Sequence, residues 1–407
     1  MKDKILENLV QKEAKRQNDT INLIASENYV SRDVREALAS VFTNKYAEGY
    51  PKARYYGGNA VIDELENLAK DRAIKLFKLS PRRWSVNVQP YSGSPANLAA
   101  YLALLPTARK IMGMQLDMGG HLTHGYKASA TGKLWKQVPY GVDKKSELLN
   151  YEQISRIAEK EKPALIVAGY TAYSRIIDFK KFRAITDSVG AIFMVDMSHF
   201  AGLVAGGVYP SPFPYADVVT TTTHKTLRGP RAALIFSKLE FSKAIDKAVF
   251  PGLQGGPHAN QIAATAVALY EAGEPSFKKY VKQVVKNAYV LSESLEKAGW
   301  RIISHGTDTH LFLVDTWKRG LSGKIASERL EEAGIVVNKN TIPYDVRSPI
   351  DPSGIRIGTP AITTRGMKEN EMKKISRLVD LTLLRRANNG GIQKEVALLC
   401  KKFPIRN

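Results

Sequence analysis

The sequence reads Val-Val-Thr-Thr-Thr-Thr-His-Lys-Thr-Leu-Arg-Gly-Pro-Arg through residues 218–231, and the rest of the chain is organised around this segment. Its β-branched start is typical of a strand, and Lys225 lies in the loop that follows. A lysine in such a place can form an imine with an aldehyde. Because one lysine alone says little, the chemistry depends on the residues that precede it.

An apolar strand that ends in an acid comes earlier in the chain. Residues 191–199 read Ala-Ile-Phe-Met-Val-Asp-Met-Ser-His, so Asp196 ends this strand and Lys225 follows one further strand. A buried carboxylate is what the ring nitrogen of pyridoxal phosphate needs, because it keeps that nitrogen protonated while the ring accepts electrons from the substrate Cα. The pair predicts a pyridoxal phosphate enzyme. The alternative is an aspartate that only caps a loop.

Strands and helices alternate from about residue 36 to residue 270. This alternation predicts an α/β fold with a mostly parallel sheet and helices on both faces. Ligands of such sheets gather beyond the carboxyl ends of the strands, where Asp196, His199 and Lys225 fall. The clearest predicted elements are the strands 164–168, 191–196 and 216–219 and the helix 179–189.

The two ends of the chain have different patterns. Residues 1–35 are expected to form a helix and an extended arm of the kind that crosses onto a partner subunit, and residues 36–270 a large cofactor-binding domain. Residues 271–407 are expected to form a small α+β domain. Its predicted elements are helices at 277–298 and 324–333, a final helix at 369–387, and strands at 301–304, 310–314 and 335–338.

Composition indicates a globular chain of two or three domains, with 407 residues of which 44% are hydrophobic. The start mixes acids and bases and lacks an apolar targeting core, and no stretch is apolar enough to suggest a membrane partner, so we expect a cytoplasmic location. The single cysteine, Cys400, excludes an internal disulfide and cysteine-pair metal sites. We expect no metal.

The formal charge of +21 is unusually basic for a metabolic enzyme. Such a charge could attract nucleic acid or a polyanionic substrate. The basic residues are scattered as pairs rather than gathered in a long run or interleaved with aromatic residues. We therefore expect no specific nucleic-acid partner, and an RNA-binding protein with a degenerate active site is kept as the alternative of another class.

Two further segments carry chemistry of their own. Small residues at 92–97 precede a helix predicted from Leu98, with Ser94 as its cap and Pro95 in its first turn. Such a helix start can cradle a phosphate, although an ordinary capped helix has the same pattern. Arg356 alternates with apolar neighbours on a probable strand and offers a planar fork for a carboxylate.

A series of sequence blocks, in one order along the chain, resembles serine hydroxymethyltransferase, a fold-type I pyridoxal phosphate enzyme. The resemblance implies reversible transfer of the hydroxymethyl group of L-serine to tetrahydrofolate, giving glycine and 5,10-methylenetetrahydrofolate, with pyridoxal phosphate held as an aldimine on Lys225. It also implies an obligate homodimer with shared active sites, or a tetramer. The blocks are 24–28, 46–51, 54–58, 91–94, 119–125, 195–209, 218–231, 250–257 and 354–366.

The same resemblance implies a role for individual residues. The catalytic residues would be Lys225, Glu48, Asp196, His121, His199, His224 and Thr222. The cofactor would be bound by Ser92, Gly93, Ser94, His121, Ser174, Asp196, His199 and Lys225, with Tyr46, Gly255 and Gly256 from across the dimer interface. The substrate would be bound by Ser26, Arg356, Glu48 and Tyr56, the last two from the partner subunit. Tetrahydrofolate would contact Leu116, Gly120, Leu122, Ser348, Pro349 and Ile350.

The chain departs from the family pattern near the expected folate site. Ile350 stands where an aromatic residue is common, Asp117 and Met118 replace a small or histidine pair, and Asn260 replaces a histidine. These departures motivate an alternative, a folate-independent aldolase that cleaves β-hydroxy amino acids such as threonine. It predicts glycine release that is indifferent to tetrahydrofolate.

Overall fold

The computed structural model describes residues 1–405. Contacts divide the chain into two compact units. The central unit is Val30–Lys282, and the terminal unit combines Met1–Tyr29 with Gln283–Asn407.

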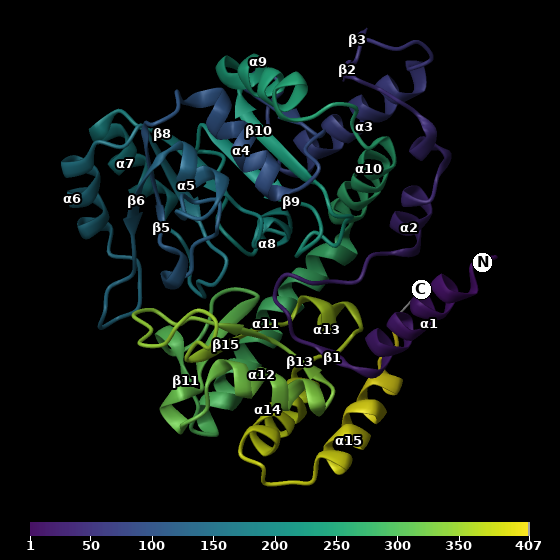
Figure 1. The fold of residues 1–407 in the computed structure, drawn as a ribbon, viewed down its shortest axis with the longest axis vertical. Helices are drawn as coiled ribbons and strands as arrows, with labels where there is room; N and C mark the ends of the chain where they lie inside the picture. The colour runs from purple at the N-terminus through teal and green to yellow at the C-terminus, as the bar shows by residue number, and fades with distance from the viewer. Residues whose placement is uncertain (406–407) are drawn as a thin grey trace. The chain divides into compact units, whose positions relative to one another are not determined.

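A seven-stranded sheet forms the centre of the central unit (Figure 1). Only β10 runs antiparallel to its neighbours, so the predicted mostly parallel sheet is confirmed. The strand order is β4 (Trp84–Asn87), β10 (Ala233–Lys238), β9 (Val218–Thr222), β8 (Ile192–Asp196), β7 (Leu165–Gly169), β5 (Lys110–Met114) and β6 (Lys136–Tyr140).

Helices cover both faces of this sheet, and the alternation of side chains along β8 shows how. Met194 belongs to the apolar cluster that α4 (Gly93–Leu104) and α9 (Leu239–Lys247) form on one face. Phe193 points the other way and stacks on Phe182 of α7 (Phe179–Val189), with ring centroids 5.8 Å apart. Asp196 is two residues after Met194 on the same strand, so its side chain points to the same face of the sheet, the face covered by α4.

The other elements of the central unit surround these layers. The helices are α2 (Arg32–Leu38), α3 (Ala60–Leu76), α5 (Ala130–Leu134), α6 (Tyr151–Glu161), α8 (Ala201–Ala205) and α10 (Ala259–Gly273), and the short strands β2 (Gly49–Tyr50) and β3 (Ala53–Arg54) pair with each other. α11 (Pro275–Lys297) runs from this unit into the other.

The terminal unit is built on a four-stranded antiparallel sheet. Its strands are β11 (Arg301–Ile302), β12 (Leu311–Asp315), β15 (Gly354–Gly358) and β14 (Asn338–Asn340), and β1 (Ile21–Asn22) pairs separately with β13 (Ile335–Val336). Its helices are α1 (Lys4–Asp19), α12 (Gly323–Glu332), α13 (Pro360–Thr364), α14 (Glu369–Leu383) and α15 (Asn389–Lys402).

Two sequence predictions about helices are wrong. The helix at 369–387 is not the last, because α14 ends at Leu383 and α15 follows it. The helix expected from Leu98 starts at Gly93, so Ser94 lies inside its first turn and Ser92 takes the N-cap position. In the part of the chain that the structure describes, every helix is too short or too polar to cross a membrane.

Candidate active site

Asp196 is a buried carboxylate held by three donors. Its Oδ2 accepts hydrogen bonds from Asn97 Nδ2 at 2.8 Å and from His124 Nε2 at 3.2 Å, and its Oδ1 accepts one from the Ser198 N–H at 3.0 Å. Burial alone would raise the pKa of Asp196, but the neighbouring imidazoles, His124 before His121, and the Ser198 contact outweigh burial and hold the pKa well below its usual range. The site therefore presents a carboxylate at the end of β8.

His121 reaches the same place on a tight turn after β5. The turn needs Gly120, since a Cβ there would lie 2.0 Å from the carbonyl oxygen of Met114. His121 Nδ1 lies 2.8 Å from Thr123 Oγ1 and also accepts the Thr123 N–H at 3.2 Å. The histidine expected to bind the cofactor is thus fixed beside the network of Asp196.

Lys225 is buried in the loop that follows β9. Hydrogen bonds join the end of β9 and this loop to the loop after β8. The N–H of Thr222, the last residue of β9, donates to Ser198 Oγ at 3.0 Å, and the Thr226 hydroxyl donates to the carbonyl of His199 at 3.0 Å. The neighbouring strand ends therefore bring Lys225 and His199 to one edge of the sheet, as predicted from their sequence positions.

His224 is largely shielded from water. Burial, and then the charges of Lys225 and Arg231, lower the pKa of His224 to about 3. Its buried Nδ1 has no hydrogen-bond partner among residues 1–405. His224 is therefore neutral at physiological pH.

The N-terminus of α4 lies against β9. A Cβ at Gly93 would meet Thr222 Cγ2 at 2.6 Å. The side chain of Ser92, at the N-cap position, makes no hydrogen bond to the first turn of α4. The first turn of a helix offers backbone N–H groups without helical partners, and a glycine leaves them accessible, so this helix start suits a phosphate. Together with the carboxylate of Asp196 and the amine of Lys225, it provides the three groups that pyridoxal phosphate requires, so the residues fit this cofactor. Ser174 is buried in the loop after β7.

A second cluster in the central unit contains residues expected to act across a subunit interface. Tyr46 donates to Glu48 Oε1 at 3.1 Å, and the rings of Tyr46 and Tyr56 pack edge to face with centroids 4.9 Å apart. A Cβ at Gly255 would lie 3.1 Å from Glu48 Oε1, and one at Gly256 would touch the ring of Tyr46. Tyr46 and Tyr56 are about half exposed, with relative accessibilities of 54% and 49%.

Arg356 lies on β15 in the terminal unit and is buried. Its guanidinium donates to Ser26 Oγ at 3.3 Å and to Asn338 Oδ1 at 3.1 Å, and burial lowers the pKa of Arg356 to about 10. Ser26 and Arg356 are thus brought together as predicted for a carboxylate site.

Comparison with known proteins agrees with this geometry. The sequence model of serine hydroxymethyltransferase matches residues 1–379. The chain belongs to the serine hydroxymethyltransferase family. It is 55% identical over 396 residues to the serine hydroxymethyltransferase of Koribacter versatilis (strain Ellin345), covering 97% of this chain and 92% of that protein. It is 54% identical over 403 residues to the serine hydroxymethyltransferase of Desulfotalea psychrophila (strain LSv54 / DSM 12343), covering 97% and 93%.

Membership of the serine hydroxymethyltransferase family confirms several predictions from the sequence. These are the fold-type I class, pyridoxal phosphate as cofactor, serine, glycine and tetrahydrofolate as substrates, and one-carbon transferase activity. The roles of individual residues stay predictions.

The residues predicted to bind folate lie in two segments. Leu116, Gly120 and Leu122 belong to the turn that carries His121, and Leu122 is half exposed. Ser348, Pro349 and Ile350 are exposed in the loop between β14 and β15 of the terminal unit. Of the departures, Asp117 has a buried Oδ1 that no group within residues 1–405 pairs with, and Asn260 donates to the carbonyl of Leu38 at 2.9 Å.

Three residues of the site were missed from the sequence: Asn97, Thr123 and His124. Asn97 and Thr123 have common residue types in ordinary positions, so only the fold reveals their contacts. The repeat of a histidine three residues after His121 was the one available signal. His121, His124 and Asp196 also bring three potential metal ligands within 4.8 Å of one another. Their hydrogen bonds to each other and to Asn97 and Thr123 explain this proximity without a metal.

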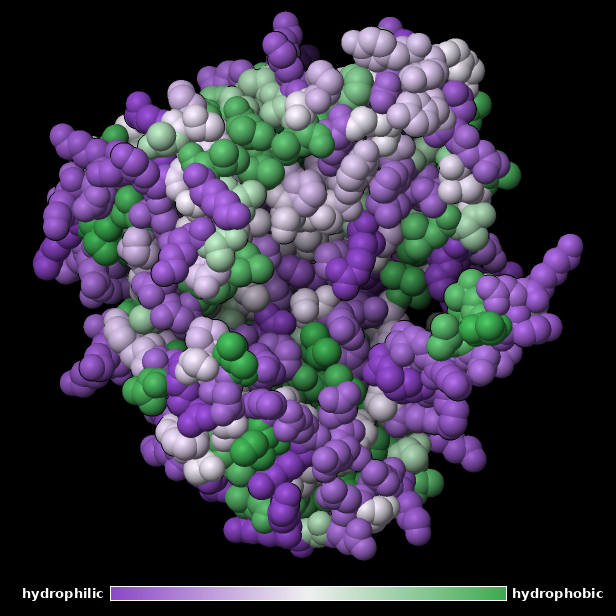
Figure 2. Space-filling model, viewed as in Figure 1, coloured by the Kyte–Doolittle hydropathy of each residue, from purple (hydrophilic) through white to green (hydrophobic). Residues whose placement is uncertain are grey.

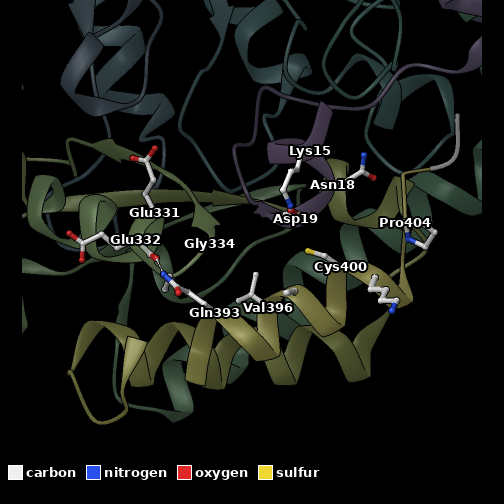
Figure 3. A pocket seen from close by; sticks show the side chains of 13 residues that line it. Lys15, Asn18, Asp19, Glu331, Glu332, Gly334, Gln393, Val396, Cys400 and Pro404 are labelled. Atoms are coloured by element: carbon white, nitrogen blue, oxygen red, sulfur yellow. Dashed lines mark hydrogen bonds and ion pairs between the residues drawn. The ribbon is translucent and has the colours of Figure 1, made fainter. Parts of the chain in front are cut away.

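A separate cavity of about 670 Å³ lies in the terminal unit (Figure 3). The end of α1, the turn from α12 to β13 and helix α15 enclose it, and Asp19, Gln393 and Cys400 are among its walls. All of its lining residues lie outside the set predicted for the active site.

Proposed function

We propose that this chain catalyses the reversible transfer of the serine hydroxymethyl group to tetrahydrofolate. The residues around Asp196 and Lys225 form its catalytic centre. The observation that carries the proposal is the buried carboxylate of Asp196, held by three donors at the end of β8 while the next strand presents Lys225. Family membership supplies the reaction class.

When bound, pyridoxal phosphate supplies an aldehyde for amino groups and a ring that accepts electrons from the substrate Cα. The amine of Lys225 would hold the cofactor. Asp196 keeps a proton on the ring nitrogen, since its own proton affinity is low. His121 would contact the ring, and Ser92, Gly93 and Ser94 with the amides of α4 would bind the phosphate. Thr222, Ser174 and His199 complete this pocket, and His224 contributes a neutral imidazole.

Arg356 and Ser26 bind the carboxylate of serine, since a guanidinium offers a planar pair of donors that matches a carboxylate. Glu48 of the partner subunit moves the proton of the serine hydroxyl when the Cα to hydroxymethyl bond breaks. The residues predicted to bind folate would contact the acceptor of the one-carbon unit.

A homodimer is part of this proposal. Tyr46, Glu48, Tyr56, Gly255 and Gly256 form a partly exposed cluster of their own, which suits donation to a neighbouring subunit. The first helix supports this. Every residue of α1 is at least partly exposed, and a green patch lies over it in Figure 2. An apolar stripe left open on a helix is typical of an interface.

The same proposal includes the domain organisation predicted from the sequence, namely an arm, a cofactor domain and a small domain with boundaries at residues 35 and 270. It also includes the cytoplasmic location. They are consistent with a cytosolic metabolic enzyme whose site is shared between subunits.

The test is glycine formation from L-serine by the pyridoxal phosphate-loaded protein, with and without tetrahydrofolate. We expect glycine only when folate is present. Lys225→Ala should abolish it, while Lys243→Ala, which removes an exposed lysine of α9, should leave it unchanged. Equal glycine release from serine or threonine without folate would overturn the transferase in favour of an aldolase.

A further inference from the structure

We infer that Asn97 and Thr123 form a positioning relay that couples the ring of His121 to the carboxylate of Asp196. The inference rests on the proposed function, in which His121 and Asp196 contact the cofactor ring. It names residues that hold the ring-binding groups in place rather than groups that touch the substrate.

Asn97 is the centre of the relay. It lies on α4, is 1% exposed, and uses three of its hydrogen-bonding positions. Its Oδ1 accepts the Thr220 hydroxyl at 2.6 Å, which fixes the orientation of the amide. Its Nδ2 then donates to both Asp196 Oδ2 and Thr123 Oγ1, each at 2.8 Å. One rigid amide therefore sets the positions of a carboxylate and a hydroxyl.

Thr123 in turn fixes the orientation of the His121 ring. The hydroxyl oxygen of Thr123 accepts from Asn97 and lies 2.8 Å from His121 Nδ1, to which its proton can be donated. The Thr123 N–H points at the same nitrogen at 3.2 Å. Two donors converge on Nδ1, so this nitrogen is an acceptor and the imidazole proton lies on Nε2.

The same argument applies to His124, which contacts the same carboxylate oxygen of Asp196 as Asn97 does. Its Nδ1 accepts the His121 N–H at 3.3 Å, so its Nε2 carries the proton that is donated to Asp196. Both tautomers follow from the direction of backbone donors. The relay thus holds the ring of His121 and the carboxylate of Asp196 as one unit.

The strand geometry explains why these residues meet. Asp196 and Thr220 are paired in register on β8 and β9, and both lie on the face covered by α4. Asn97 comes one turn after the uncapped helix start, so the segment proposed to bind the phosphate also carries the residue that orients the ring-binding groups. Each contact lies inside the central unit.

The first test is the ¹⁵N spectrum of the histidine-labelled holoenzyme, with the His121 signals assigned by their loss in His121→Asn. We expect an unprotonated Nδ1 and a protonated Nε2 in the unmodified protein. A protonated Nδ1 overturns the relay without recourse to any variant. The measurement can be repeated without cofactor, so it is independent of the catalytic proposal.

The second test compares Thr123→Val, which removes only the hydroxyl, with Thr123→Ser, which keeps it. We expect Thr123→Val to weaken pyridoxal phosphate binding about tenfold and to reduce the visible circular dichroism of the bound cofactor. It should also lower kcat more than it changes KM for serine. Thr123→Ser should retain most of each property.

Thr265→Val is the matched control. Thr265 is a buried threonine of α10 whose hydroxyl lacks a hydrogen-bond partner within the described residues, so its loss should leave binding and dichroism unchanged. If Thr123→Val matches Thr123→Ser in affinity, dichroism and ¹⁵N shifts, the relay is refuted. Failure of the unmodified enzyme to bind pyridoxal phosphate would instead count against the proposed function.

Discussion

Gly93 starts α4 directly against the side chain of Thr222. Because an added Cβ would lie 2.6 Å from Thr222 Cγ2, Gly93→Ala must push the first turn of α4 away from β9. Overpacking of this kind typically costs about 1–3 kcal/mol, so we expect pyridoxal phosphate to bind roughly tenfold more weakly. Equilibrium dialysis of the cofactor against the purified variant measures the change.

A second substitution can remove the clash between residue 93 and Thr222. Thr222→Ser removes Cγ2 and keeps the hydroxyl, so Gly93→Ala combined with Thr222→Ser should recover most of the lost affinity. If the double variant binds no better than Gly93→Ala alone, the clash is not the cause of the weakening.

At the scale of elements, Asp217 joins three of them. Its carboxylate accepts the N–H of Phe193 on β8 and a guanidinium hydrogen bond from Arg183 on α7, both at 2.9 Å, and pairs with Lys238 on β10. Burial alone would raise the pKa of Asp217, but these partners, Lys238 first, lower the pKa below its usual value. The stability it contributes is complete above the unfolded pKa and is lost as the pH falls through the folded pKa.

We therefore expect Asp217→Asn to lower the free energy of unfolding by about 2 kcal/mol at pH 7, because charged donors lose their acceptor. The difference from the unmodified protein should shrink as the pH is lowered from 5 toward 3, in urea unfolding curves recorded at each pH. Asp187→Asn, which removes a mostly exposed partner of Arg183, should cost about 0.5 kcal/mol or less. A constant difference across this pH range would contradict the assignment.

The elements also show what a sequence can and cannot specify. The helix Phe179–Val189 was predicted with its bounds, because Asp178 caps its start and Gly190 takes a left-handed conformation at its end. α15 was missed, since the Asn-Gly-Gly at 389–391 is typical of a loop and the apolar face of this helix is defined only by the core it joins. In the site, Asp196 and Lys225 could be identified from the local sequence pattern. The role of Asn97 could not, because it depends on contacts between segments that are distant in the sequence.

For the whole molecule, the proposed sharing of active sites predicts complementation between two inactive variants. Lys225→Ala removes the cofactor lysine, and Glu48→Gln removes the proton-transfer group. If Glu48 acts across the interface, a mixed dimer has one site with both defects and one intact site. With random mixing we expect about a quarter of the unmodified activity.

Unfolding and refolding an equimolar mixture, followed by the serine assay, measures this recovery. A mixture of Lys225→Ala with Lys225→Arg serves as the control, since no combination of these subunits restores a lysine. Activity no higher than that of the separate variants would show that Glu48 serves the site of its own chain.

The buried Cys400 makes this protein a convenient host for site-directed labelling. Burial raises the pKa of its thiol, and its side chain is 2% exposed, so a maleimide reagent should modify it slowly at neutral pH. A cysteine introduced at an exposed position outside the proposed interface, such as Lys243 on α9, would then react almost alone. Spin labels or fluorophores placed in this way would report distances between subunits with the native thiol left in place.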